Sequence, residues 1–192
     1  MIDVKKSALV IIDMLYDFTC EGGCAYAESS RDIVPNVKSL LDGCRRRGMK
    51  IVFIQHCYRE GKPDRNLNEM RKCCVEKTGG EEIHPDLEVL PEDYVIRKRR
   101  YSAFFGTDFD LVLRENGIQN VILCGVKTNC CVRATATDAH NLDYHVIVAE
   151  DCVATDCEEA GRINLEDIRR YLGRVLTREE LFMELDEGCS KN

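Results

Sequence analysis

The sequence lacks long apolar runs, an excess of basic residues and the common nucleotide-binding motifs. The apolar run near its start is too short to span a bilayer, and no signal-peptide cleavage pattern accompanies it. The net charge of −7 argues against broad binding to nucleic acid or to anionic membranes. Neither GxGxxG after the first expected strand nor GxxxxGKS/T occurs, so dinucleotide and P-loop binding are unsupported. We therefore expect a cytoplasmic protein that binds neither nucleic acid nor membrane.

Metal-binding patterns are also missing, although the chain has twelve cysteines. Without a signal sequence, these cysteines are expected to stay reduced in a cytosol. Cys20 and Cys24 have no matching second pair with histidines at ligand spacing, which makes zinc a weak interpretation. The histidines form neither HExxH nor another metal-binding pair, and we interpret each as structural: His56, His84, His140 and His145. We predict no metal and no other cofactor.

The composition and the hydrophobic pattern predict the fold. A chain of 192 residues with 44% hydrophobic and 32% charged residues fits one globular domain, assigned here to residues 1–192. Short apolar runs predict buried strands at 7–12, 51–55, 94–96, 121–124, 144–149 and 174–176. Helical patterns lie between most of these runs, and a last helix is expected from 177 to about 185. This alternation predicts an α/β fold, a three-layer α/β/α sandwich with a mostly parallel, doubly wound central sheet of about six strands.

One connection is unusually long. Residues 56–93 contain few apolar residues and several glycines and prolines. Loops of this length in compact domains are often functional. We expect this section to cover an active site or to bind a partner.

Two adjacent cysteines lie where a strand is expected to end and a helix to begin. Gly125 breaks the apolar run, Thr128 and Asn129 are good N-cap residues, and a helix is predicted from Cys130 to Asn141. The helix N-terminus would favour a thiolate in its first turn. The alternative is that Cys130 and Cys131 are small buried residues, as most free cysteines are.

Two charged residues are predicted to meet these cysteines at the same edge of the sheet. Asp13 follows the first strand and Lys98 follows the third, and ligands bind at the carboxyl ends of strands in such sheets. The alternative role for Asp13 is a turn cap. Neighbours on a helix are separated by about 100° around its axis, so we expect only one of Cys130 and Cys131 to face the pocket.

Three stretches together carry a family resemblance. They are ALVIIDMxxDF (Ala8 to Phe18), KxxYSAFFGT (Lys98 to Thr107) and GVxTNxCVxATAxDA (Gly125 to Ala139). In this order and spacing they resemble the isochorismatase-like cysteine hydrolases. That group includes nicotinamidases, N-carbamoylsarcosine amidase, ureidoacrylate amidohydrolase and biuret hydrolase.

The resemblance implies a catalytic triad of Asp13, Lys98 and Cys131. It also implies a cis peptide bond between Val126 and Lys127, with the backbone N–H groups of Lys127 and Cys131 forming an oxyanion hole. Substrate-binding positions are expected within the same motifs, at Phe18, Tyr101 and Thr128. Relatives are usually dimers or tetramers, so we expect a homo-oligomer with part of residues 57–93 near the interface or over the pocket.

The predicted function is metal-independent hydrolysis of a C–N bond in a small amide, carbamoyl or ureido compound, through a thioester on Cys131. Metal-dependent nicotinamidases have an Asp-x-His motif where this chain has Gln55-His56-Cys57-Tyr58, which argues against that subgroup. Retention of the cysteine favours an amidase over an isochorismatase-type enol-ether hydrolase, which remains an alternative. A second alternative is a non-catalytic member that binds a partner or senses redox state. A substrate carboxylate could be held by one of several arginines: Arg59, Arg65, Arg71, Arg97 or Arg133.

Overall fold

A parallel sheet of six strands organises the fold, in the order β3-β2-β1-β4-β5-β6. The computed structural model describes residues 2–70 and 72–189. The strands are β1 (Ser7–Ile12), β2 (Lys50–His56), β3 (Tyr94–Lys98), β4 (Asn120–Val126), β5 (His145–Ala154) and β6 (Gly173–Leu176). The predicted strands and the doubly wound α/β architecture are confirmed. The largest difference in strand length is in β5, which continues through the half-buried Glu150 and Asp151 to pair with the end of β4.

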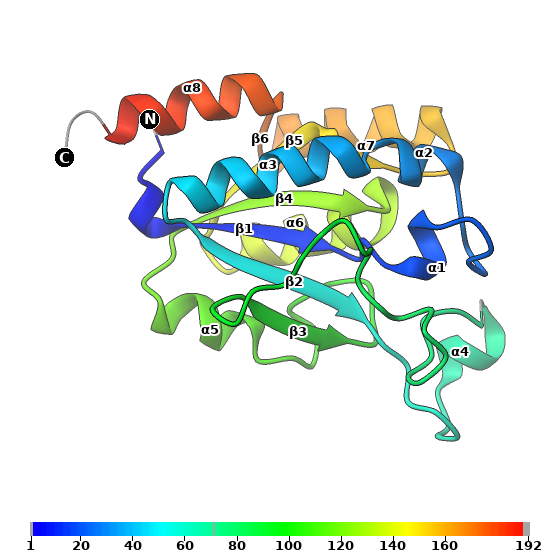
Figure 1. The fold of residues 1–192 in the computed structure, drawn as a ribbon. Helices are drawn as coiled ribbons and strands as arrows, with labels where there is room; N and C mark the ends of the chain where they lie inside the picture. The colour runs from blue at the N-terminus through cyan, green and yellow to red at the C-terminus, as the bar shows by residue number, and fades with distance from the viewer. Residues whose placement is uncertain (1, 71, 190–192) are drawn as a thin grey trace.

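Helices cover both faces of the sheet (Figure 1). They are α1 (Tyr16–Thr19), α2 (Glu28–Asp32), α3 (Val34–Arg46), α4 (Arg65–Glu69), α5 (Phe109–Glu115), α6 (Arg133–Asn141), α7 (Glu158–Tyr171) and α8 (Arg178–Cys189). A short 3₁₀ turn, η1 (Val4–Lys6), precedes β1. Apolar residues of α3 and α8 pack with Leu9 and Ile11 on one face, whereas those of α5, α6 and α7 pack with Val10 and Ile12 on the other. Both faces of β1 are therefore buried, which explains its continuous apolar sequence.

The strand order places a topological switch point between β1 and β4. From β1 the chain moves outward through β2 and β3, and then crosses to β4 on the other side of β1. Ligands in such sheets bind outside the carboxyl ends of the strands at this point. Asp13 follows β1 there, and the segment with the two adjacent cysteines follows β4.

The segment after β4 differs from its prediction. Gly125 does not end the strand: its φ is +107°, and a Cβ atom there would overlap the backbone of Ile12 in the adjacent strand. A π-helical turn, η2 (Thr128–Val132), then precedes α6, and the N-cap residue is Lys127. The predicted capping role of Thr128 and Asn129 is wrong. The Asn129 side chain instead accepts a hydrogen bond of 2.7 Å from the Thr155 hydroxyl, which belongs to the segment after β5.

The long connection between β2 and β3 packs against the segment that follows β1. Backbone N–H groups of Tyr16 and Asp17 donate to the carbonyls of Glu82 and Gly80, at 2.8 and 3.0 Å. The buried Asp17 carboxylate also accepts a hydrogen bond of 2.6 Å from the Cys74 backbone N–H. These bonds hold the connection beside the carboxyl edge of the sheet.

The helices in the described part of the chain are all too short or too polar to cross a membrane.

Candidate active site

Asp13 lies directly after β1, on a turn that fixes its carboxylate. Its φ of +51° is in the left-handed region, which costs a residue with a Cβ atom about 1–2 kcal/mol. The backbone N–H of Asp13 donates to the Ile54 carbonyl, and its Oδ1 accepts from the His56 backbone N–H, both at 2.9 Å. The residue is fully buried. These two bonds to β2 hold the carboxylate at the switch point in spite of the backbone cost.

The Lys98 side chain occupies the centre of the site. Its ammonium lies 2.7 Å from Asp13 Oδ2, 3.3 Å from Cys131 Sγ and 3.3 Å from His56 Nδ1. It also donates a hydrogen bond of 3.0 Å to the Arg100 carbonyl. Burial by itself would lower the pKa of Lys98, but Asp13 and Cys131 raise it above its ordinary value. The side chain is therefore a buried cation that faces both a carboxylate and a thiol.

Cys131 lies in the π-helical turn and is 7% exposed. Burial raises the pKa of its thiol above the ordinary value, Lys98 offsets part of this rise, and Asp13 adds to it. The direction of this shift is opposite to the thiolate expected from the helix N-terminus, because desolvation is the largest influence on the thiol and exceeds the opposing effect of Lys98. The thiol carries its proton until a base removes it. Asp13 is the carboxylate in position to do so.

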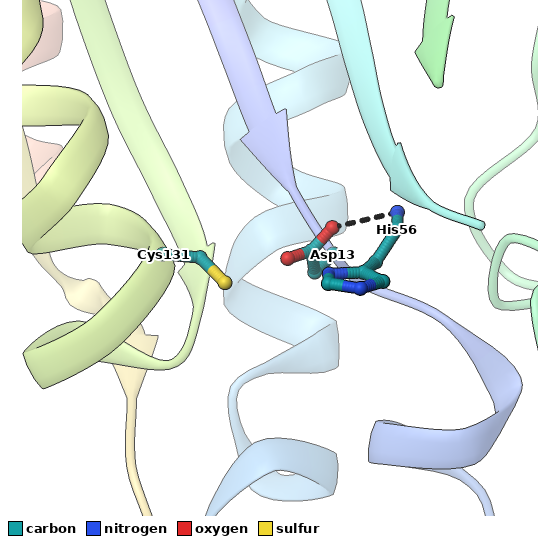
Figure 2. Close-up of side chains that lie close together, drawn as sticks. All are labelled: Asp13, His56 and Cys131. Atoms are coloured by element: carbon teal, nitrogen blue, oxygen red, sulfur yellow. Dashed lines mark hydrogen bonds between the residues drawn. The ribbon is translucent and has the colours of Figure 1, made fainter. Parts of the chain in front are cut away.

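His56, interpreted from the sequence as structural, belongs to this site. Figure 2 shows its ring beside the Asp13 carboxylate, which faces Cys131. Burial and then the Lys98 charge lower the pKa of His56 to about 4 from its ordinary value of 6.5. The sequence does contain a signal: His56 is the last residue of a central strand, and that strand ends at the same edge as Asp13.

Asp13, His56 and Cys131 also form a possible metal-binding group, with one donor atom from each within 4.8 Å of the others. The Lys98 ammonium, however, already contacts a donor atom of all three residues. A divalent ion among these donors would face that ammonium at close range and at low local dielectric. The three donors therefore fit the lysine cation and not a resident metal ion.

A cavity of about 280 Å³ opens above the thiol. Its lining residues are Phe18, His56, Tyr58, Met70, Cys73, Tyr101, Val126, Lys127, Asn129, Cys130, Cys131 and Asp156. Two of the expected substrate-binding residues, Phe18 and Tyr101, are among them, whereas Thr128 is buried and does not line the cavity. Three residues come from the long connection between β2 and β3, which agrees with its predicted position over an active site.

Both adjacent cysteines line this cavity, so the expectation that only one faces it is wrong. They lie in a π-helical turn and not in a regular α-helix, and Cys130 is partly exposed whereas Cys131 is buried. The two thiols differ in their charged neighbour. The 3.3 Å contact with the Lys98 ammonium is made by Cys131.

The peptide bond between Val126 and Lys127 is cis, as the resemblance implied. Both residues line the cavity, next to the π-helical turn. The Lys127 ammonium lies 2.5 Å from Asp156, and its hydrogen bond is the main cause that lowers the pKa of Asp156 to about 2. One wall of the cavity therefore carries an ion pair.

Four of the five arginines considered as carboxylate ligands lie elsewhere. Arg65 pairs with Glu69 on α4, Arg133 pairs with Asp167, and Arg97 donates to the Gln55 side chain. Neither these three nor Arg59 line the cavity, and Arg71 lies outside the described residues.

The fold and this site define the class: a doubly wound α/β protein whose candidate active site centres on a buried thiol at the switch point. The family follows from comparison with known proteins. Residues 7–180 match the isochorismatase domain, and the chain belongs to the isochorismatase family of hydrolases.

Three similar proteins illustrate the relationship. The chain is 35% identical over 187 residues to the uncharacterized isochorismatase family protein YwoC of Bacillus subtilis, covering 95% of each chain. It is 30% identical over 173 residues to the ureidoacrylate amidohydrolase RutB of Agrobacterium fabrum, covering 77% of this chain and 75% of the relative. The crystal structure of N-carbamoylsarcosine amidase from Thermoplasma acidophilum aligns with a TM-score of 0.82 at 29% identity, covering 91% of this chain and 97% of that one.

Proposed function

We propose that the protein is a metal-independent cysteine amidohydrolase that cleaves a C–N bond of a small amide, carbamoyl or ureido compound through a thioester on Cys131. The observation that carries the proposal is the Lys98 ammonium, 2.7 Å from the Asp13 carboxylate and 3.3 Å from the Cys131 sulfur. A thiol, a base and a cation at such distances are the components of nucleophilic catalysis. The names of the amidase relatives support the type of bond.

In the first step, Asp13 accepts the thiol proton while the Cys131 sulfur forms a bond to the substrate's carbonyl carbon. Lys98 stabilises the negative charge on sulfur as the proton leaves, because its ammonium lies beside it. The carbonyl oxygen becomes an oxyanion and accepts hydrogen bonds from the backbone N–H groups of Lys127 and Cys131. Each such donor could contribute roughly 3 kcal/mol to the tetrahedral intermediate.

In the second step, the intermediate collapses. The protonated Asp13 gives its proton to the departing nitrogen, the C–N bond breaks, and ammonia or an amine leaves a thioester on Cys131. Asp13 then accepts a proton from water as the water oxygen attacks the thioester carbonyl. The C–S bond breaks, the acid product leaves, and the proton returns to the sulfur. Amide and water are consumed, and acid and amine are formed, with the enzyme unchanged.

The cavity supports a small substrate. Its volume of about 280 Å³ is at the lower end of ligand sites, and aromatic side chains from Phe18, Tyr58 and Tyr101 line it. In the described lining, the cation that lies outside the triad is Lys127, which is already paired with Asp156. These features favour a compact compound with a planar amide or ureido group.

We also propose that the protein works in the cytoplasm as a homodimer or homotetramer, with part of residues 57–93 near the interface. The motivation is the long connection between β2 and β3, whose described residues include one short helix and the exposed Met70. Sedimentation at micromolar concentration should give a mass of at least twice 21.9 kDa. A species of 21.9 kDa alone would refute the assembly.

Ammonia release from a panel of small amides, carbamoyl amino acids and ureido acids tests the function. We expect turnover of at least one member that is lost in Cys131→Ala, with Cys130→Ala as the matched control. Turnover of an enol ether that persists after thiol blocking would support the isochorismatase-type alternative instead. If the correctly folded protein releases no ammonia from any compound of the panel and does not hydrolyse the enol ether, the result would support a non-catalytic member of the family.

A further inference from the structure

The hydrogen-bonding state of His56 follows from its contact with Lys98. The two side chains meet through Lys98 Nζ and His56 Nδ1, which are 3.3 Å apart. An ammonium can only donate, so Nδ1 must accept. The low pKa of His56, which results from burial and the Lys98 charge, keeps the ring neutral. A neutral imidazole has one N–H group, and here it lies on Nε2.

That Nε2–H group has no acceptor among the described residues. Nε2 is buried and makes no hydrogen bond, and the whole residue is 6% exposed. The ring is held in place by the tilted ring of Tyr58, with 4.5 Å between the centroids, and its backbone N–H donates to Asp13. Buried polar groups are nearly always satisfied, so an unpaired donor in a fixed ring indicates a partner that arrives from outside the chain.

A bound substrate in the cavity can supply the missing hydrogen-bond acceptor. His56 and Cys131 line the same cavity, and a donor atom of each belongs to the group that lies within 4.8 Å. In the proposed mechanism the scissile carbonyl oxygen is already bound by backbone N–H groups of Lys127 and Cys131. The Nε2–H group is therefore available to another acceptor on a substrate bound in this cavity.

We propose that His56, through Nε2–H, binds a second hydrogen-bond acceptor of the substrate, so that the site selects small amides or ureas that carry a carbonyl or similar oxygen near the scissile group. This proposal rests on the amidohydrolase function proposed above. It makes His56 a substrate-binding residue as well as a contact of Lys98.

Two substitutions separate these roles. In His56→Gln the side-chain amide N–H₂ can reach the position of Nε2, while the acceptor for Lys98 is lost. In His56→Asn the side-chain oxygen lies near the position of Nδ1 and keeps the acceptor, while the distal donor is lost. The probes are malonamide and butyramide, which have similar length, and of which malonamide alone carries a second carbonyl.

The wild-type protein should favour malonamide in kcat/KM by about tenfold, the discrimination of one buried hydrogen bond. His56→Gln should keep most of this preference, and His56→Asn should lose it. A preference kept in His56→Asn and lost in His56→Gln would overturn the proposal, because His56 would then act only by positioning Lys98. Equal use of both probes by the wild-type protein would overturn it as well.

A binding measurement gives an answer that does not depend on turnover. In ¹⁵N-labelled Cys131→Ala protein, the signal of His56, assigned by its loss in His56→Asn, should show the Nε2–H tautomer. Malonamide should shift this Nε2–H signal and butyramide should not. An Nδ1–H tautomer, or a signal that neither probe moves, would overturn the proposal. If the tautomer and the malonamide shift are observed while the wild-type protein hydrolyses nothing, the binding role holds and the amidohydrolase function fails.

Discussion

The two edges of the sheet each carry a cavity, and the larger one is not at the candidate site. A cavity of about 530 Å³ lies at the amino ends of the strands, with Lys6, His140 and His145 among its lining residues. Those three side chains are exposed, whereas Asp13, Lys98 and His56 beside the smaller cavity of about 280 Å³ are buried. Charges interact far more strongly when they are removed from water. Burial of ionisable groups at the switch point therefore distinguishes the candidate site, and cavity size does not.

The largest expected effect comes from removing the thiol. Cys131→Ala should lower kcat on the best substrate by a factor on the order of 10⁴ or more, because the thioester can no longer form. Asn120→Ala, which alters the lining of the larger cavity, should leave kcat on the same substrate unchanged. Steady-state kinetics on both purified variants checks this difference. Equal losses in the two would remove the distinction between the edges.

Removing the central cation should have the next largest effect. Lys98→Ala should lower kcat/KM on the order of 10²–10³-fold, because nothing then stabilises the sulfur as it loses its proton. It should also destabilise the fold by about 3–5 kcal/mol, because the Asp13 carboxylate is left buried without its partner.

The matched control for this variant is Lys38→Ala, which removes an exposed lysine 3.9 Å from Asp42 and should change stability by less than about 0.5 kcal/mol. Urea unfolding measures both variants. If Lys98→Ala and Lys38→Ala have the same free energy of unfolding, the Lys98–Asp13 pair contributes no more to stability than an exposed pair.

The low pKa of His56 predicts a pH dependence of stability. Burial, Lys98 and Arg100 lower this pKa while Asp13 and Asp64 raise it, and the result is about 4 against an ordinary 6.5. Between these values the unfolded chain binds a proton that the native protein does not, so stability falls as pH falls from 6.5 toward 4, by about 3 kcal/mol in total. Urea unfolding across this range should show a shallower fall in His56→Gln. If the free energy of unfolding falls equally with pH in both proteins, the lowered pKa of His56 is contradicted.

Chelation should have the smallest effect. The donor atoms of Asp13, His56 and Cys131 already surround the Lys98 ammonium, so activity should not depend on a metal ion. Dialysis against a chelator is expected to leave the rate within experimental error. Activity that is lost on dialysis and regained with zinc, iron or manganese would show that a metal replaces or accompanies the lysine.

The sequence predicts the sheet well because its central strands β1, β2 and β4 are buried on both faces. The run at Ser7–Ile12 is apolar from Ala8 onward, and its predicted and observed bounds agree. The three residues of the proposed triad could also be placed at one edge, because Asp13 and Lys98 lie at strand ends and Cys131 lies in the turn that follows β4. Strand endings and residue types are local features, so a single sequence displays them.

Features that depend on distant contacts could not be predicted in the same way. The π-helical turn at Thr128–Val132 accompanies the close packing of Gly125 on Ile12, which the local pattern does not show. The raised pKa of Cys131 depends on how deeply the tertiary structure buries the thiol. The role of His56 was missed because it depends on a neighbour 42 positions away in the sequence, Lys98.

The measurement that tests the central claim most directly is the mass of the protein during turnover. The wild-type protein is mixed with its best substrate from the panel, quenched in acid, digested and analysed by mass spectrometry. We predict that the peptide containing Cys131 gains the mass of the substrate's acyl group, on its sulfur, and that Cys131→Ala shows no adduct. Substrate hydrolysis with the acyl group found on Cys130 would contradict the account. Hydrolysis with no acyl group on any cysteine at any quench time would contradict it as well.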